Sequence, residues 1–443
     1  MRRKALTRRI CLIFLSAVLM LAATGCYDRH EIDEMAYVMA IGLDKGKTSE
    51  LKMTLQFAVP IMTGSGGGGG GGNGSGDGGS SGGQQKKPLI VTTLETPSIH
   101  SGINVVNSYV SKQLNFAHAQ LVAFSEELAR DGVQKYIHAL MRSKMARGSM
   151  VVVVVKGNAE EYLNSTNLLL EINPSKYYKM TYDSYKYTGL TANTTLINFY
   201  LKMECYCSQA IATLAGVSKY KSTQDIIAKD GVSNEKGEEN DLDYRTAGNI
   251  PQYGAPATEI MGIAIFDGDK MVGELTGKET SYYLMVTGEY KNSYISVPDP
   301  MHKGEFIILN AKERRKPAKK LEMVDGIPHA DIEIDLEGDI VDIQSGMNYE
   351  EPANVRILEK AIEEYLGKEI LIFLQKTAEE YHSDVCNLGQ LIRTKFWLWE
   401  KWKEFNWLER YKDTKFNVKV KFKIRRSGLL LRTNPAESSE GGR

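Results

Sequence analysis

The sequence predicts an α+β protein of two to three mixed-sheet domains with flanking helices, after a cleaved signal peptide. Three observations predict this: short apolar strands alternate with amphipathic helices, a polar segment divides the chain, and a short apolar run follows a basic N-terminus. The 443 residues fit two or three domains, and 42% hydrophobic residues suffice for packed cores. We therefore expect an N-terminal α/β domain over 26–214, a polar linker over 215–256, an α+β domain over 257–433 and a disordered tail over 434–443.

The first 25 residues have the features of a bacterial lipoprotein signal. They carry five basic side chains and no acidic one, and an apolar run covers residues 10–23. A basic head before a short apolar core is typical of export signals, and this run is shorter than the roughly 20 residues that span a bilayer. Small residues then precede Cys26, as in a lipobox, whose cysteine accepts a diacylglycerol and an N-palmitoyl chain. We predict lipidation of Cys26; an ordinary cut signal with an incidental cysteine and a retained membrane helix are the alternatives.

The charge and the scattered ligand residues argue against several function classes. Without the signal the chain carries 50 basic against 55 acidic residues, so it has no global basic field for nucleic acid. The seven histidines form no pair at metal-ligand spacing, and no catalytic triad is recognisable. The sequence therefore predicts neither an enzyme nor a metal site.

Three cysteines remain after Cys11 leaves with the signal and Cys26 is lipidated: Cys205, Cys207 and Cys386. Few cysteines argue against a disulfide scaffold. Cys-x-Cys spacing is too tight for an easy disulfide, and no histidine cluster accompanies it. We expect buried or idle thiols here.

The N-terminal half alternates strands and helices. Residues 35–43 and 51–59 predict a hairpin, the second strand with the period-two pattern of a half-buried strand. The Gly-rich segment 64–83 cannot bury a core and predicts a flexible loop whose ends lie roughly 25 Å apart. Further on, the pattern predicts strands at 89–94 and 151–155, with a short apolar run at 119–124, and helices at 98–114, 126–130 (capped by Ser125), 133–141 and 159–163.

The C-terminal half begins with a hairpin and ends with a long helix and a strand. An Asp-Gly turn joins strands 260–266 and 270–275, and residues 279–286 are either helical or extended. Residues 330–336 predict a strand, and Glu337-Gly338-Asp339 predicts a turn into 340–343. The remaining elements are an amphipathic helix over 355–382, a second helix near 388–402 and a strand over 416–424.

Two groups of side chains are candidate contact sites for partners or membrane. Lys419, Lys421 and Lys423 line one face of the last strand, where they would meet lipid headgroups or protect a sheet edge. Tryptophans cluster at 397, 399, 402 and 407, and dense aromatics indicate either an interface or a packed core. As candidate contacts we name Trp397, Trp399 and Trp402 together with the three lysines.

Several short motifs, in order along the chain, resemble the Ger(x)C family of spore germination lipoproteins. After the lipid cysteine come Tyr27-Asp28-Arg29-His30-Glu31-Ile32 and then Gly42-Leu43-Asp44. Three further segments match the family's middle, namely His118 with Glu126-Glu127-Leu128-Ala129-Arg130, Lys156-Gly157-x-Ala159, and the pair of strands 262–266 and 270–275. The chain closes with a Val-rich strand and Arg425-Arg426-x-Gly428.

The resemblance implies a C subunit of a nutrient germinant receptor. Such proteins are lipid-anchored on the outer face of the spore's inner membrane, beside membrane-spanning A and B subunits. The family implies mixed α/β domains, no catalytic activity and no cofactor. The residues alone leave two other functions open: a solute-binding lipoprotein of a transporter, which needs a deep cleft between two similar lobes, and an exported hydrolase.

Overall fold

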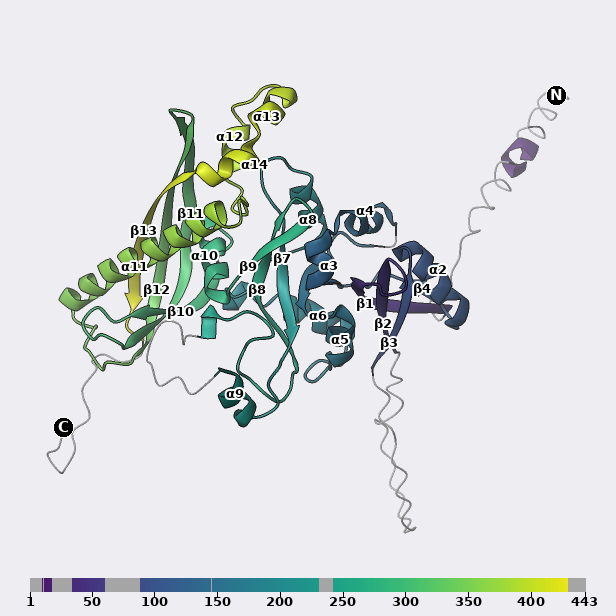
Figure 1. Cartoon of the computed structure of the whole chain (residues 1–443), viewed down its shortest axis with the longest axis horizontal. Helices are drawn as coiled ribbons and strands as arrows, with labels where there is room; N and C mark the ends of the chain where they lie inside the picture. The colour runs from purple at the N-terminus through teal and green to yellow at the C-terminus, as the bar shows by residue number, and fades with distance from the viewer. Residues whose placement is uncertain are drawn as a thin grey trace, which may run out of the picture.

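The computed structural model describes residues 10, 12–17, 34–59, 88–144, 146–230 and 242–428. The predicted lipidation site Cys26, the Gly-rich segment 64–83 and the tail 434–443 lie outside these residues. Within them the chain forms a nine-stranded and a four-stranded sheet with helices packed on both, as Figure 1 shows. The predicted α+β class is confirmed by these two mixed sheets.

The N-terminal hairpin has the predicted pairing. β1 (Met35–Lys45) runs antiparallel to β2 (Leu51–Ala58), which pairs with β3 (Leu89–Thr96), and the short β4 (Gln113–Asn115) pairs with β1. β2 is more buried than its alternation predicted, because Thr54 and Gln56 on its polar face are also fully buried. The amide of Gln56 donates to the Leu163 carbonyl, which satisfies it in the interior.

Three parallel strands continue this sheet beyond β1. They are β5 (Leu121–Ser125), β6 (Val151–Lys156) and β7 (Ile211–Val217). The valine run of β6 is buried on both faces, as predicted: Val152 and Val154 belong to one hydrophobic cluster, Val153 and Val155 to the other. The antiparallel hairpin β8 (Thr258–Asp267) and β9 (Lys270–Leu275) completes the sheet.

Helices cover the two faces of the large sheet. One face packs against α2, α3, α4 and α8, and the other against α5 and α6. Ser125 caps α3 as predicted, accepting from the Leu128 N–H. The predicted helix 98–114 is shorter, because residues from 113 onward pair with β1 as β4. The bounds are α2 (Ile99–Tyr109), α3 (Glu126–Asp131), α4 (Gln134–Arg142), α5 (Ala159–Ser165), α6 (Pro174–Tyr182), α7 (Tyr185–Thr188) and α8 (Leu196–Met203).

The predicted linker 215–256 connects two strands of one sheet. Its first residues lie in β7, which pairs antiparallel with β8 on the far side of the segment. Between them the structure describes α9 (Thr223–Asp230) and a short 3-10 turn, Leu242–Tyr244. Strands from both predicted domains therefore share the large sheet.

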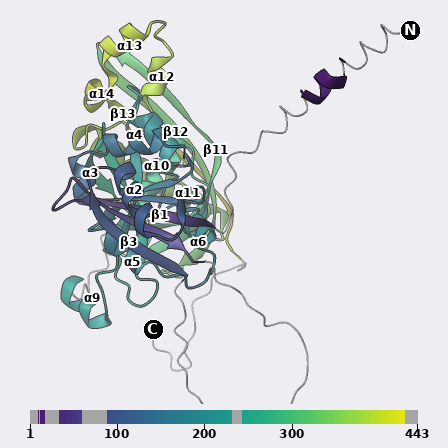
Figure 2. The same cartoon turned by 90° about the vertical axis from the view of Figure 1, so that its right-hand side faces the viewer.

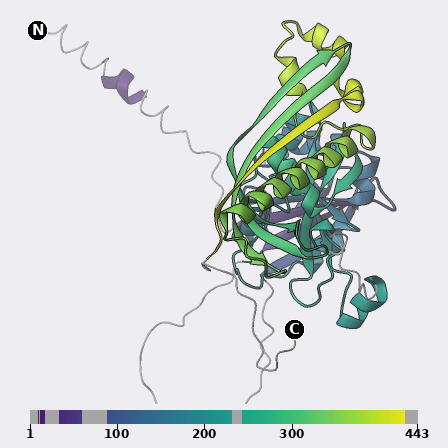
Figure 3. The ribbon, with the colours of Figure 1, turned by 90° about the vertical axis from the view of Figure 1, so that its left-hand side faces the viewer.

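The second sheet has the order β10-β11-β12-β13. Its strands are β10 (Asn292–Pro298), β11 (Phe306–Val324), β12 (Ile327–Ile343) and β13 (Lys415–Arg426). Helix α11 (Pro352–Glu379) lies across one face, as Figure 3 shows, and buries its apolar stripe there. Residues 279–286, which the sequence left open, lie in α10 (Gly277–Thr287), which begins with a capping box between Thr276 and Glu279.

Two predictions for the second half are wrong. The turn at 337–339 is absent: β12 continues through it, and Gly338 pairs there with Ala311 of β11 and Ile424 of β13. A Cβ on Gly338 would lie 2.9 Å from the Asn310 carbonyl oxygen and from the Phe422 ring. The glycine thus permits close strand packing rather than a turn.

The helix over 388–402 is broken into α12 (Gly389–Arg393) and α13 (Trp399–Phe405), since Leu398 between them is extended. After α13 follow α14 (Trp407–Arg410) and a 3-10 turn, Tyr411–Asp413.

Candidate interaction surface

The segment from α12 to α13 forms a tip at one end of the molecule. In Figures 1 and 2, which are related by a turn about the vertical axis, α13 lies at the upper end and α5 in the lower half. The residues before and at the start of α13 are exposed: Trp397 is 100% exposed, Leu398 55% and Trp399 43%. We call Trp397, Leu398 and Trp399 the tip residues. An exposed group of large apolar side chains indicates a contact surface.

Basic side chains lie close to the aromatic rings of this tip. The guanidinium of Arg393 lies 5.3 Å from the Trp399 ring centroid, and Lys403 Nζ lies 5.7 Å from it. Lys403 also lies 5.1 Å from the ring of Tyr206, which packs edge-on against Trp399 at 5.8 Å. These are cation–π distances, so the tip combines exposed rings with positive charge.

The other two tryptophans are buried. Trp402 and Trp407 are 2% and 1% exposed. Trp402 packs against Phe396 and Phe405 with ring centroids 5.4 and 5.9 Å apart. The sequence left open whether the tryptophans form an interface or a packed core. Trp402 and Trp407 lie in the core, whereas Trp397 and Trp399 are exposed.

The three lysines lie away from the tip, farther along β13. Lys419, Lys421 and Lys423 are exposed and stand in register with Glu333, Asp335 and Glu337 of the parallel strand β12. Lys421 forms an ion pair with Glu333, and Lys423 Nζ lies 3.0 Å from Glu359 of α11. On β12, Asp335 also accepts two 2.7 Å bonds from Arg314, which hold its pKa below the usual range. Acidic side chains of β12 and α11 thus lie beside the lysines of β13.

β13 is an edge strand of the second sheet, and α11 covers part of that edge. The backbone N–H groups of Phe422 and Ile424 donate to Glu363 and Glu359 of α11, at 3.0 and 2.9 Å. Glu363 is half-buried and bound to backbone. Side chains that satisfy edge N–H groups hinder pairing with another strand.

Several motifs of the N-terminal half meet at the carboxyl ends of β1, β5 and β6. Asp44 ends the Gly-Leu-Asp motif, and its carboxylate accepts from the N–H groups of Ala159 and Glu160 at 2.7 and 3.0 Å. Burial raises the pKa of Asp44, against the two backbone bonds. Gly42 leaves room for α5, since a Cβ there would lie 3.0 Å from Leu163. Asp44 thus caps the first turn of α5, and Gly42 allows the helix to pack closely on β1.

The lysine of the Lys-Gly-x-Ala motif joins the two halves of the chain. Lys156 Nζ lies 2.5 Å from Glu274 of β9 and 4.0 Å from Glu126 of α3, which also binds Arg130 at 2.7 Å. Ligands of α/β proteins often bind at the carboxyl ends of parallel strands. Here the charged groups at that edge form ion pairs with one another. Among the described residues there is no group of three or more histidine, cysteine or acidic side chains that could hold a metal ion.

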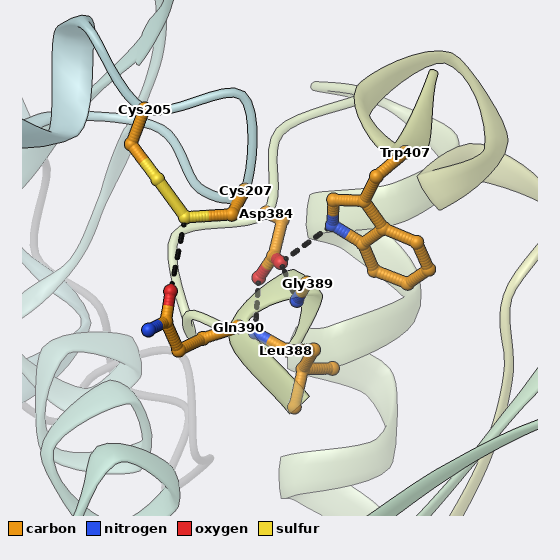
Figure 4. The surroundings of a disulfide bond; sticks show 7 residues. All are labelled: Cys205, Cys207, Asp384, Leu388, Gly389, Gln390 and Trp407. Atoms are coloured by element: carbon orange, nitrogen blue, oxygen red, sulfur yellow. Dashed lines mark hydrogen bonds between the residues drawn. A yellow bond between two sulfur atoms is a disulfide. The ribbon is translucent and has the colours of Figure 1, made fainter. Parts of the chain in front are cut away.

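The prediction of idle thiols at Cys205 and Cys207 is wrong. The structure joins them in a disulfide, with Cα atoms 5.2 Å apart, as Figure 4 shows. The segment turns out of α8 at Glu204, which brings the two sulfurs together despite their short spacing. The Cys207 sulfur lies 3.2 Å from the Gln390 side-chain oxygen, and the Gln209 N–H donates to the Asp384 carbonyl. The disulfide loop thus packs against the C-terminal half.

A buried carboxylate, Asp384, accepts several hydrogen bonds in the part of the C-terminal half that packs against the disulfide loop. Asp384 accepts from the N–H groups of Leu388 and Gly389, at 3.0 and 2.7 Å, and from the indole N–H of Trp407 at 2.9 Å (Figure 4). Burial raises the pKa of Asp384. The prediction for the nearby Cys386 is confirmed: it is fully buried, and burial raises the pKa of its thiol to about 12.

Sequence reasoning missed the partners of the exposed tryptophans. Lys403 follows Trp399 by one helical turn, so helical spacing could have identified it. Tyr206 lies 193 positions before Trp399, in a segment that matched no motif, and only the fold brings them together. No described helix has both the length and the apolar character needed to cross a bilayer.

Comparison with known proteins identifies the family of the whole chain. Residues 28–213 match the family model described as "Spore germination protein N-terminal domain", and residues 261–428 match "Spore germination B3/ GerAC like, C-terminal". Together these matches cover well over half of the sequence.

Individual relatives match over nearly their full lengths. Spore germination protein KC of Bacillus subtilis (strain 168) is 25% identical over 437 residues, which are 96% of this chain and 98% of the relative. Spore germination protein B3 of the same organism is 23% identical, over 93% of this chain and 96% of the relative. The crystal structure of the GerBC protein aligns with 87% of this chain and 96% of its own, at 16% identity and a TM-score of 0.49. The two family matches show that this chain belongs to the GerAC-like family of spore germination proteins.

Proposed function

We propose that this protein is the lipid-anchored, non-enzymatic C subunit of a germinant receptor, acting with membrane-spanning A and B subunits in nutrient-triggered spore germination. The observation that carries the proposal is the match of both germination domains, in order, over most of the chain. The relatives that align over their whole lengths are themselves named as spore germination proteins. We place the subunit on the outer face of the spore's inner membrane, held by a lipid on Cys26.

The arrangement of charged side chains supports a scaffold role rather than catalysis. Two ionisable groups of the shared motifs are bound to backbone or to an opposite charge: Asp44 to the start of α5, and Lys156 to Glu274. A catalytic group needs access to a substrate at the reacting atom. Asp44 is 3% exposed, so we assign it to positioning α5.

A lipid tether would confine the subunit to the plane of its partners. Two acyl chains on one cysteine anchor a protein stably, whereas one chain binds only marginally. Confinement raises the effective concentration of the subunit near the A and B proteins without any new contact. The subunit would then couple nutrient binding by the complex to the start of germination.

A deletion strain tests this function. Spores that lack the chain should lose rehydration in response to at least one nutrient, and the wild-type gene should restore it. A variant with an exposed, uninvolved substitution, Asp342→Asn, should restore it equally well, because Asp342 is exposed at the end of β12. Spores that lack the chain yet respond to every nutrient at the wild-type rate would argue against a receptor role.

A further inference from the structure

The tip residues have the composition of a membrane-interface anchor. Trp397, Leu398 and Trp399 are all exposed, with no described element covering Trp397, which is 100% exposed. Tryptophan is enriched where membrane proteins cross the headgroup layer, because its ring is apolar and its N–H is polar. The exposed leucine beside it adds apolar surface, which would move out of water if it entered the boundary between headgroups and acyl chains.

The charges of the tip suit an anionic surface. Between residues 393 and 404 the chain carries four cations and two anions, Glu400 and Glu404. The cations are Arg393, Lys395, Lys401 and Lys403, and three of them are exposed, with Arg393 half-buried against Trp399. A basic side chain close to an anionic leaflet is attracted to the lipid headgroups. The aromatic and basic groups therefore favour the same surface.

The tip is small and well supported. Buried Trp402, with Phe405 stacked on it and Phe396 packed edge-on against it, forms an apolar base for this segment. A stable protein interface buries about 800 Å² on each partner, which is far more than two tryptophans and a leucine supply. Shallow insertion needs only a few side chains when a tether already holds the protein near the bilayer.

We propose that Trp397, Leu398 and Trp399 insert into the interfacial layer of an anionic bilayer and so fix the orientation of the protein on the membrane. This inference rests on the proposed lipid tether, which brings the tip to the surface. The tip and the tether would act as two separate contacts with one membrane.

Quenching of tryptophan fluorescence tests the insertion. The lipidated full-length protein is reconstituted into vesicles of phosphatidylglycerol and phosphatidylcholine that carry bromine on their acyl chains. Because two of the four tryptophans lie at the tip and the other two are buried, brominated lipid should remove roughly half of the emission. The double variant Trp397→Phe/Trp399→Phe should lose this quenching, and vesicles of phosphatidylcholine alone should quench less.

A relocated tryptophan provides the matched control. Leu170, between α5 and α6, is 102% exposed, and these helices lie in the lower half of the views that place α13 at the upper end (Figures 1 and 2). Adding Leu170→Trp to the double variant should give a fluorophore that brominated lipid does not quench. Quenching of this residue to the same extent as Trp397 and Trp399 would contradict an orientation set by the tip.

Flotation separates this inference from the proposed anchor. Protein that floats with the vesicles but shows no quenching at the tip would overturn the insertion and leave the anchor intact. Protein that fails to float would instead refute the anchor. A photo-crosslinking group at position 397 that forms adducts with one membrane protein and none with lipid would overturn the insertion in favour of protein docking.

Discussion

The carboxylate of Asp44, at the end of β1, accepts a 2.7 Å hydrogen bond from the backbone N–H of Ala159, at the start of α5. The two residues belong to separate motifs, 115 positions apart. A second bond from the Glu160 N–H satisfies another of the helix's free donors. Two local motifs are thus one structural unit, in which the end of a strand caps a helix.

Replacing this cap should destabilise the fold. Asp44→Ala leaves two N–H groups without their acceptor in a site where Asp44 is 3% exposed. We expect the free energy of unfolding to fall by about 1–3 kcal/mol, measured by urea denaturation. Asp342→Asn, at an exposed position, should change it little. Equal stabilities for Asp44→Ala and the control would show that the cap contributes nothing.

The buried carboxylate at the disulfide junction should be equally sensitive. Asp384→Asn places amide hydrogens where Leu388, Gly389 and Trp407 already donate, so at least one donor loses its acceptor. We expect a loss of about 1–3 kcal/mol in unfolding free energy. Near-ultraviolet circular dichroism should also change, because Trp407 loses a fixed partner. Asp413→Asn, an exposed change two residues after Tyr411, is the control.

Acid should weaken the turn between β1 and β2 through Glu95. Its carboxylate accepts from the backbone N–H groups of Lys47, Thr48 and Ser49, and these bonds lower its pKa from the usual value near 4.5 to about 2. A lowered folded-state pKa stabilises the fold above the unfolded pKa, and this contribution is lost as the pH falls through the folded pKa.

The comparison that checks this prediction is between wild type and Glu95→Gln. The variant should be less stable at neutral pH, and the difference should shrink as the pH falls from about 4.5 toward 2. Thermal unfolding across that range measures it. Glu379→Gln, at an exposed position near the end of α11, should follow the wild-type curve. A constant difference at all pH values would rule out the carboxylate bonds as its source.

Calorimetry distinguishes the receptor subunit from the alternative of a solute-binding lipoprotein. That alternative needs a cleft between two similar lobes, whereas the described residues form sheets of nine and four strands with different topology. We expect no heat of binding when amino acids or sugars are titrated into the isolated protein. Tight saturable binding of one such solute would favour the transport function instead.

Local patterns predicted elements whose neighbours are close in sequence. The hairpins at 35–59 and 260–275, the valine strand at 151–155 and the long helix α11 follow from periodicity and turn residues. The predictions failed where a distant partner decides the local structure. Gly338 stays in a strand, where it pairs with Ile424 of β13, 86 positions later. The Cys205–Cys207 disulfide was missed because short spacing was taken to exclude it, and the path of the backbone after α8 decides it.

The candidate surface was predictable only in part. The tryptophan cluster is visible in the sequence, but helical spacing alone could not divide it into buried Trp402 and exposed Trp397. The break between α12 and α13 accompanies that division: Leu398 is extended and Trp397 before it is fully exposed, while Trp402 inside α13 is buried. The lysine face was predicted correctly as a face, yet its acidic neighbours come from β12 and α11.

Membrane fractionation of wild type and Cys26→Ala tests the tether most directly. We expect the wild-type protein to remain with the membrane after a wash in 1 M salt, which shortens the screening length to about 3 Å and removes surface electrostatics. Cys26→Ala should be released by the same wash, because the acyl chains are gone and the tip alone holds weakly. Full retention of Cys26→Ala in the washed membrane would contradict the lipid anchor on which the account depends.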